Sequence, residues 1–408
     1  MNLRPYQVRA IQKARDEYRK GSRDILLVAP TGSGKTILGA TIAKSSKAKG
    51  SEVLWLAHRE ELVEQAKGKL PPDIHVTTIQ RLVASGKRPE AGVVVFDEAH
   101  HFVAARWNEV AEHYKNALRI GLTATPQRNN GLGLGDMFSA MVVVASYSEL
   151  IAEGFIVECD VIAPDGRQRT LSMSPEDAVR RYAWDRKSIT FASTVPEAHR
   201  IAECLGSTAA CIEGATKKDI RKDLIGAFRS GEIRHLVNVF VLTEGFDAPA
   251  ADVCILARGC TVEAAYIQMV GRILRPSEGK ERALLVDLIG ACHEFGMPTM
   301  DREHALVKGK APKRKVPPIW FCSHCQMAFA ARPANGRCKA CGSPLPVPKA
   351  IAVERRRLAR KEGVKADDTK RKREAWARLI EEAKRRGYKP GWAWHRFRSR
   401  YGHAPPRA

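Results

Sequence analysis

The sequence predicts an α/β protein with two tandem parallel-sheet domains, followed by a small cysteine-rich domain and a basic helical tail. Short apolar runs rich in Ile, Leu and Val alternate with helical patterns, which is typical of parallel sheets. Polar residues stand where several of these runs end, and ligands of such sheets bind outside the carboxyl ends of the strands. Four of the ten cysteines are clustered between residues 322 and 341, which marks a separate small domain.

The first apolar run begins a segment, residues 24–44, that reads as a strand, a glycine-rich loop and a helix. Glycines let backbone N–H groups close around phosphate oxygens, and the N-terminus of a helix adds positive potential. We expect Lys35 to reach the outer phosphates and the Thr36 hydroxyl to hold Mg²⁺. Ala29 stands where the generic loop has its first glycine. The residues expected to bind nucleotide here are Thr31, Gly32, Ser33, Gly34, Lys35 and Thr36.

A phosphate loop also needs an acid for the metal, and Asp97 and Glu98 directly follow an apolar strand expected over 92–96. We expect Asp97 to hold Mg²⁺ through water, and Glu98 to position and deprotonate the attacking water. Phosphoryl transfer further requires positive charge on the transition state. Arg272 and Arg275 are expected on one face of a helix over 263–274, from which they would reach the phosphates when the cleft between the domains closes.

The remaining patterns complete the two sheets. In the first domain a helix is expected over 3–18, strands over 52–57, 75–78 and 118–122, a mobile glycine-rich loop over 127–136 and a helix over 147–154. In the second domain we expect strands over 157–163, 188–191, 209–212, 235–241, 253–257 and 282–287, with helices over 174–186, 196–205 and 217–230. Residues 306–318 have the composition of a basic, proline-bearing linker.

The clustered cysteines form two C-x2-C pairs, Cys322 with Cys325 and Cys338 with Cys341, separated by twelve residues. This spacing fits a tetrahedral four-thiolate zinc ribbon over 319–346, and two disulfides are the alternative. So small a domain buries too little apolar surface on its own, so we expect the zinc to be structural. Contact with DNA is the first role to consider for the ribbon, and docking of a partner is the second.

The charge is concentrated at the C-terminal end. Residues 301–408 hold 29 Lys and Arg against 9 Asp and Glu, whereas the first 300 hold 39 against 36. Such asymmetry indicates a polyanionic partner, most simply nucleic acid, although a solvated tail is the alternative. In the tail, Trp392 alternates with basic residues such as Arg396 and Arg398, which suits base stacking and phosphate contact. A helical hairpin whose aromatic residues pack on one another is equally compatible.

The N-terminus, MNLRPYQVRA, is too polar for a secretory segment, and no run approaches the length of a membrane span. We therefore expect a soluble, cytoplasmic protein that does not contact a membrane.

The motifs stand in a definite order: RPYQ, APTGSGKT, AHREEL, TTIQ, DEAH, TATP, ITFAST, TEGFD and QMVGRILR. Over about residues 3–290 this series resembles the superfamily-two helicases, closest to the DEAH-box branch of restriction-enzyme helicase subunits and phage-encoded helicases. The resemblance implies two RecA-like domains, over 1–155 and 156–305, with ATP and Mg²⁺ between them and nucleic acid across the top. It also makes APTGSGKT a Walker A loop.

The resemblance further implies roles for individual residues. Gln7 would read adenine, and Gly245 and Asp247 would sense the nucleotide from the second domain. His100, Thr123, Thr125 and Gln268 would couple hydrolysis to movement of the strand. Arg59, Thr78 and Ser193 would contact the backbone of the nucleic acid.

We therefore predict an ATP-dependent DNA helicase or translocase of a bacterium or a phage-infected cell, with a basic tail, residues 347–408, that adds nucleic-acid or partner binding. Its partner would be single-stranded, forked or branched DNA, and the tail would recruit replication or repair proteins. One alternative is a duplex-DNA translocase or branch-migration enzyme. Another is an ATP-gated loader or scaffold that binds DNA without unwinding it.

Overall fold

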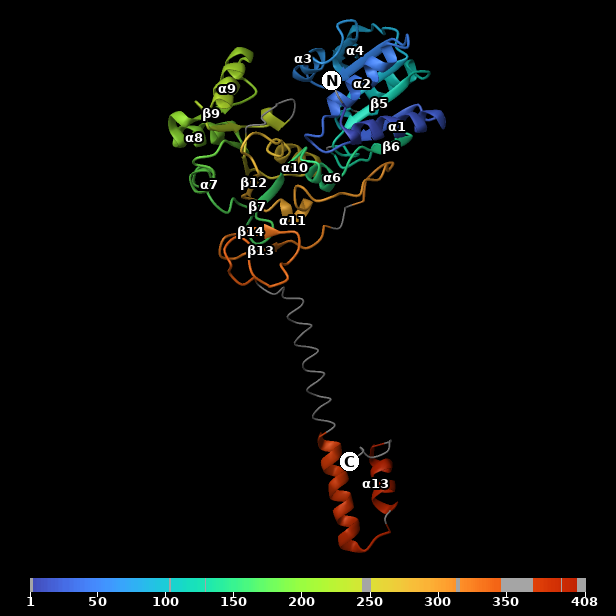
Figure 1. Ribbon diagram of the computed structural model, residues 1–408, viewed down its shortest axis with the longest axis vertical. Coiled ribbons are helices and arrows are strands. Elements are labelled where there is room, and N and C mark those ends of the chain that lie inside the picture. The colour runs from blue at the N-terminus through green and yellow to red at the C-terminus, as the bar shows by residue number, and fades with distance from the viewer. Residues whose placement is uncertain are drawn as a thin grey trace. The chain divides into compact units, whose positions relative to one another are not determined.

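The computed structural model describes residues 3–102, 104–128, 130–243, 251–312, 316–345, 370–389 and 391–401. The chain forms two compact units, Met1–Leu345 and Pro346–Ala408. The larger unit contains two sheets, each covered by helices, and the smaller one contains a pair of helices (Figure 1).

The first sheet has six parallel strands in the order β3-β2-β4-β5-β1-β6, which defines the first lobe. Its strands are β1 (Asp24–Val28), β2 (Val53–Ala57), β3 (His75–Thr78), β4 (Val93–Asp97), β5 (Leu118–Thr123) and β6 (Ala140–Val143). Its helices are α1 (Pro5–Arg19), α2 (Lys35–Lys47), α3 (Glu60–Lys67), α4 (Ile79–Ser85), the 3₁₀ turn η1 (Ala99–His101), α5 (Ala104–His113) and α6 (Tyr147–Ala152).

The second sheet has eight strands in the order β13-β14-β7-β12-β11-β8-β10-β9, and the six from β7 to β9 are parallel. These six define the second lobe: β7 (Glu158–Ile162), β8 (Ser188–Ala192), β9 (Ala209–Ile212), β10 (His235–Asn238), β11 (Val253–Ala257) and β12 (Arg282–Asp287). Its helical segments are α7 (Pro175–Tyr182), α8 (Val195–Leu205), η2 (Gly206–Thr208), α9 (Lys218–Ser230), η3 (Val241–Thr243), α10 (Glu263–Val270) and α11 (Cys292–Phe295).

The cysteine-rich segment is part of the second sheet. Its hairpin consists of β13 (Trp320–Phe321) and β14 (Met327–Phe329), and β14 pairs antiparallel with β7. Ala163 N–H also donates to the carbonyl oxygen of Gln326 at 2.9 Å. The small domain predicted at this place is therefore joined to the second lobe by backbone hydrogen bonds.

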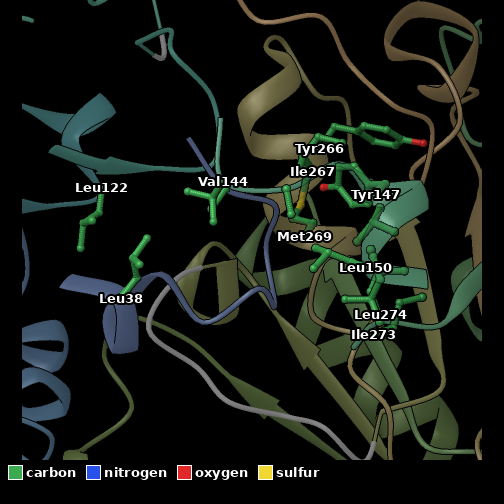
Figure 2. Close-up of a cluster of buried hydrophobic side chains, with 14 of the residues drawn as sticks. Leu38, Leu122, Val144, Tyr147, Leu150, Tyr266, Ile267, Met269, Ile273 and Leu274 are labelled. Atoms are coloured by element: carbon green, nitrogen blue, oxygen red, sulfur yellow. The ribbon is translucent and has the colours of Figure 1, made fainter. Parts of the chain in front are cut away.

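One buried apolar cluster extends through both lobes (Figure 2). It includes Leu38 of α2 and Leu122 of β5 from the first lobe, Leu150 of α6, and Ile267 of α10 from the second lobe. All four side chains are at most 3% exposed. Burial of apolar surface on this scale is the main favourable term that holds two such sheets together.

Most strands lie where the apolar runs predicted them, and three expectations need correction. The strand β6 was not predicted. The helix α10 ends at Val270, so Arg272 and Arg275 lie in the turns after it and do not share a helical face. The described part of loop 127–136, expected to be mobile, is hydrogen-bonded to residues 307–311, which belong to the expected linker. The predicted domain boundaries stay a prediction.

In the smaller unit, residues 370–386 are helical and α13 spans Gly391–Tyr401. Phe397 is fully buried, and its ring centroid lies 5.7 Å from that of Trp376 and 4.6 Å from that of Tyr401. The aromatic residues of the tail thus pack on one another, as one of the two alternatives expected. Among the described residues, no helix combines the length and the apolar character needed to cross a membrane.

A buried ion pair joins two neighbouring inner strands of the first sheet near their N-terminal ends. Arg119, in the otherwise apolar strand β5, is 8% exposed and forms a two-pronged contact with the Asp24 carboxylate of β1, one prong of which measures 2.7 Å. Its Nη1 also donates to the carbonyl oxygens of Ala111 and Tyr114, each at 2.9 Å. Every contact of this guanidinium is with an acceptor, as a buried charge requires.

We expect Arg119→Ala to lower the free energy of unfolding by about 3 kcal/mol, because it leaves the Asp24 carboxylate without its partner. The matched control is Arg81→Ala, which removes an exposed ion pair with Glu60 at 3.0 Å and should cost under about 1 kcal/mol. Denaturant unfolding of the full chain measures both. Equal effects of the two substitutions would contradict a structural role for Arg119.

Candidate active site

The phosphate loop joins β1 to α2 and is shaped by two glycines with positive φ. Gly32 has φ +92° and Gly34 has φ +81°, a conformation that L side chains rarely adopt. A Cβ on Gly34 would also lie 2.9 Å from Nε2 of Gln7. The Ser33 hydroxyl donates to the Pro30 carbonyl oxygen at 2.7 Å and closes the turn. The loop therefore presents its backbone in the shape that phosphate binding needs.

Two side chains of α1 brace this loop from behind. The Tyr6 hydroxyl donates to the carbonyl oxygen of Ser33 at 2.7 Å, and Gln7 Nε2 donates to the same oxygen at 3.2 Å. Gln7 Oε1 in turn accepts from the Arg4 N–H at 3.0 Å, and Gln7 is 2% exposed. The amide of Gln7 thus supports the loop, and its contact with adenine stays a prediction. Tyr6 was not predicted.

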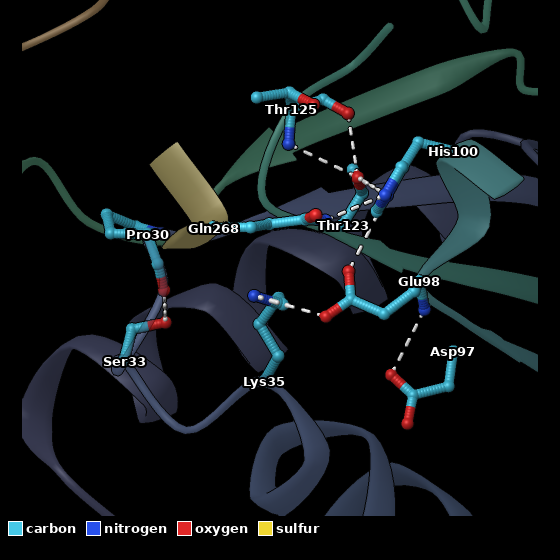
Figure 3. Close-up of polar contacts among 9 residues, drawn as sticks. All are labelled: Pro30, Ser33, Lys35, Asp97, Glu98, His100, Thr123, Thr125 and Gln268. Carbon is cyan, nitrogen blue, oxygen red and sulfur yellow. Dashed lines mark hydrogen bonds and ion pairs between the residues drawn. The ribbon is translucent and has the colours of Figure 1, made fainter. Parts of the chain in front are cut away.

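Asp97 is the last residue of β4, and Glu98 directly follows it (Figure 3). Glu98 has φ 52°, a left-handed conformation that is rare for a residue with a side chain and that occurs often at functional sites. Its Oε1 lies 3.7 Å from Nζ of Lys35. Burial, and then the neighbouring Glu98 carboxylate, raises the pKa of Asp97 to about 7, while Lys35 acts against this shift. A buried carboxylate near Lys35 of the loop is a suitable ligand for a magnesium ion.

His100 links these acids to the second lobe. Its Nδ1 lies 3.0 Å from the Thr123 hydroxyl and its Nε2 lies 2.8 Å from Nε2 of Gln268, which comes from α10 (Figure 3). The Thr123 hydroxyl donates its proton to the carbonyl oxygen of Thr125 at 2.7 Å. It must therefore accept from Nδ1–H of His100, which leaves Nε2 as the acceptor for Gln268. All four coupling residues predicted from the sequence are buried and meet here.

The arginine segment after α10 lies against the phosphate loop. A Cβ on Gly271 would lie 2.4 Å from Cβ of Thr31, so only a glycine allows this approach. A Cβ on Gly32 would lie 3.6 Å from Cγ of Arg275, and burial lowers the pKa of the Arg275 guanidinium. Arg272 is 6% exposed. Gly271 is the first residue after α10, so the glycine that permits this approach lies between the helix and the two arginines.

A second lysine belongs to this environment and was not predicted. Burial lowers the pKa of Lys69, the nearby Arg275 adds to this effect, and Asp97 opposes it. Lys69 lies two residues after α3, in a segment with no motif and no periodicity that would have singled it out.

The four clustered cysteines form a separate candidate metal site. Their sulfur atoms all lie within 4.8 Å of one another, with Sγ of Cys322 3.6 Å from that of Cys341 and Sγ of Cys325 3.5 Å from that of Cys338. Tetrahedral Zn–S bonds of about 2.3 Å place the sulfur atoms about 3.8 Å apart, whereas a disulfide needs about 2.05 Å. The arrangement therefore fits zinc, and the two disulfides considered as an alternative are not formed.

The residues predicted to contact nucleic acid are dispersed. Arg59 is exposed at the start of α3, whereas Thr78 is 6% exposed and its hydroxyl caps α4 by accepting from the Arg81 N–H. Ser193 is exposed, and its hydroxyl donates to the carbonyl oxygen of Ala257 at 3.2 Å. Gly245 and Asp247 lie outside the described residues. In the smaller unit, Arg396 and Arg398 are exposed and Trp392 is half-buried.

Comparison with known proteins finds two family models that match successive parts of the chain. The model of the family described as "Type III restriction enzyme, res subunit" matches residues 1–72 and 71–128, and that of the "Helicase conserved C-terminal domain" matches residues 176–277. The two matches together include the phosphate loop, both acids and Gln268, Arg272 and Arg275.

Three relatives illustrate the range of similar sequences. A 51.5 kDa protein of a Lactococcus phage is 26% identical over 67% of this chain and 67% of its own length. The mitochondrial ATP-dependent helicase irc3 of Schizosaccharomyces pombe is 28% identical over 70% of this chain and 57% of its own. The DNA 3'-5' translocase XPB2 of Sulfurisphaera tokodaii is 24% identical over 71% and 82%. The chain thus spans little more than half of the yeast relative.

Among solved structures, a fragment described as an HsdR subunit of a type I restriction enzyme from Vibrio vulnificus YJ016 has the same fold. Its TM-score is 0.59 at 22% identity, over 73% of this chain and 67% of that one.

Two lobes of this topology, with a phosphate loop on one and an arginine segment on the other, define an ATP-dependent helicase or translocase, a class that uses nucleotide and Mg²⁺. The two family models, with the phage and helicase relatives, support the resemblance to the superfamily-two helicases of the restriction-enzyme and phage branch.

We expect Gly271→Ala to lower kcat/KM for ATP by about tenfold to a hundredfold, because the added methyl group displaces the arginine segment from Thr31. The control is Gly259→Ala, whose Cβ would meet only Nη2 of Arg167, at 3.9 Å. Steady-state ATP hydrolysis by both variants checks this. Wild-type kinetics of G271A would show that the contact with Thr31 has no part in turnover.

Proposed function

We propose that this chain is a DNA-stimulated ATPase that uses hydrolysis between its two lobes to move along DNA or to unwind it. The observation that carries the proposal is the contact of Gln268 with His100 at 2.8 Å. It joins the second lobe to the acid motif of the first lobe. A rearrangement of the residues around the phosphates can therefore move both lobes.

The proposed roles follow from the positions of the side chains. Lys35 and the backbone of loop 31–36 bind the phosphates, and Thr36 and Asp97 hold Mg²⁺, which neutralises charge on them. Glu98 takes the proton of the attacking water. Arg275 and Arg272 supply positive charge to the transition state from the second lobe. Nζ of Lys35 lies 3.7 Å from Oε1 of Glu98, so the two opposite charges offset one another within the site.

DNA is the proposed partner for two reasons. XPB2, a relative over 71% of this chain, is named a DNA translocase. In addition, the described residues of the smaller unit hold twelve Lys and Arg against three Asp and Glu, with Arg396, Arg398 and Arg400 exposed. Since the aromatic residues of these helices are engaged with one another, phosphate contact is the main contribution that we propose for them.

We further propose that the four cysteines hold one structural Zn²⁺. The sulfur positions require little movement to reach tetrahedral coordination. Because β14 continues the second sheet, this metal would hold the hairpin that pairs with β7.

The test of the proposed activity is ATP turnover measured side by side with single-stranded DNA, duplex, four-way junction and RNA. We expect DNA to stimulate turnover, and Glu98→Gln to reduce it by about a hundredfold or more while nucleotide binding is kept. Stimulation by duplex without strand separation would favour a translocase, which the XPB2 similarity supports. Turnover by the variant equal to wild type would refute the assignment of Glu98.

The contribution of the tail is tested by the salt dependence of DNA binding. If six to ten cations of the protein contact phosphates, affinity should fall by about 10³ to 10⁵ between 50 and 200 mM salt. The double variant R396A/R398A should reduce the slope of log K against log salt by about two. The control is R180A/R200A, which removes arginines that are paired with Asp177 and Glu176 on α7 and α8. An unchanged slope in the tail variant would exclude these phosphate contacts.

A further inference from the structure

Residues 306–311, here called the interlobe strap, run antiparallel to the glycine-rich loop 127–136 of the first lobe. Gly135 N–H donates to the carbonyl oxygen of Val307 at 2.9 Å, and Gly133 N–H donates to that of Gly309 at 2.7 Å. Ala311 N–H donates to Gly131 at 3.0 Å, and Leu132 faces Lys310 as a bridge pair. Leu306 packs on the apolar cluster of the first lobe. Most contacts use backbone atoms, so they fix position whatever the side chains.

The sequence of the loop is adapted to this contact. A Cβ on Gly133 would lie 2.1 Å from the carbonyl oxygen of Val307, and one on Gly135 would lie 2.6 Å from its carbonyl carbon. Neither distance occurs for real Cβ atoms against backbone, so a larger residue would push the strap away. Asp136 adds a side-chain contact, because its Oδ2 accepts from Gly309 N–H at 3.2 Å.

Both ends of the strap are fixed to the second lobe. Before it, the Arg302 guanidinium donates to Glu263 of α10 at 2.9 Å and is almost completely buried. After it, the chain enters the hairpin that pairs with β7. The chain therefore leaves the second lobe, pairs with the first and returns, which gives the lobes a second connection besides the one through α6.

The partner of the strap directly follows the coupling threonines. Loop 127–136 begins after Thr125 and Pro126, and Leu134 N–H donates back to the carbonyl oxygen of Pro126 at 3.1 Å. A pull on the strap is thus transmitted within a few residues to Thr123 and Thr125, which hydrogen-bond to each other and to His100. Because backbone pairing and packed turns are stiff, a displacement of the second lobe would move Thr123 and Thr125 by a similar amount.

We propose that the interlobe strap is a positioning element that makes the threonine segment respond to the separation of the lobes, and so couples DNA binding to ATP turnover. This inference rests on the proposed DNA-stimulated ATPase. The strap acts through Thr123 and Thr125 and does not itself touch nucleotide. It has to stay paired with the loop throughout the cycle, since a strap that detached would transmit nothing.

The first test measures ATP turnover with and without DNA in Gly133→Ala, with Gly214→Ala as control, since a Cβ on Gly214 meets nothing within 4 Å. We expect G133A to lose about fivefold or more of the stimulation by DNA, with basal turnover and KM for ATP within about twofold of wild type. Loss of basal turnover would indicate a purely structural contact. Full stimulation in G133A would overturn the proposal.

Asp136→Ala removes only the acceptor for Gly309 N–H and adds no volume, so it covers the case in which G133A does not fold. It should reduce the stimulation of ATP turnover by DNA, to a smaller extent than G133A does. Stimulation equal to that of the wild type would contradict the role of the strap.

The second test locks the strap with the cysteine pair L132C/K310C in the zinc-loaded full chain, with each single variant as control. Opposed residues at such a non-hydrogen-bonded position have Cα atoms about 4.5 Å apart, which a disulfide can span. We expect the bond to form with and without nucleotide, and the oxidised protein to keep its DNA stimulation. Failure of the bond to form, or loss of stimulation on oxidation, would overturn the proposal. Formation of the disulfide can be measured without ATP turnover, so it tests the strap alone. If the proposed function were wrong, DNA would not stimulate ATP turnover even by the wild-type protein.

Discussion

The hydrogen bond between Gln268 and His100 is the contact on which the rest of the site depends. It is the point where the second lobe reaches the acid motif, and it fixes the proton arrangement of the imidazole, because Thr123 has already donated to Thr125. His100 accepts from Gln268 while it donates to Thr123. The Glu98 carboxylate lies 3.5 Å from the same ring. One buried histidine thus contacts the acid proposed to take the proton of water, the threonine segment and the opposite lobe.

In the structure, several charged and polar side chains of the site contact one another or the phosphate loop. Lys35 faces Glu98, Arg275 lies over the phosphate loop, and Gln7 and Tyr6 hold the Ser33 carbonyl oxygen. The left-handed backbone of Glu98 belongs to the same arrangement, because it turns the acid away from the axis of β4 and toward the lysine.

The local features of this protein could be predicted from its sequence. Each of these features combines an apolar run or a fixed spacing with reactive residues only a few positions away. They are the phosphate loop, the acids at the end of β4 and the cysteine pairs. The strand β6 was missed although residues 140–144 form an apolar run, the ordinary signal of a buried strand. The end of α10 at Val270 was missed because apolar residues continue beyond it with Ile273 and Leu274.

Contacts between distant parts of the chain explain what else was missed. Tyr6 is important because of where Ser33 lies, Lys69 because of where Asp97 lies, and residues 306–311 because of the glycines of loop 127–136. Tyr6 stands in the RPYQ motif, in which only Gln7 was given a role, whereas Lys69 and the strap have no motif. Composition alone made the strap look like a linker. Arg119 carries a charge inside an apolar strand, which is a signal, but its partner Asp24 can be identified only in three dimensions.

The pairing of β14 with β7 also bears on how the chain behaves in a crowded cell. Without the hairpin, β7 would be the outermost strand of the second sheet and would present a free row of N–H and C=O groups to other chains. Such an edge is a template for intermolecular pairing. The cysteine hairpin covers it and leaves only the two-residue strand β13 on the outside. The hairpin therefore protects the second sheet from edge-to-edge pairing with other chains, and this protection does not depend on any contact with DNA.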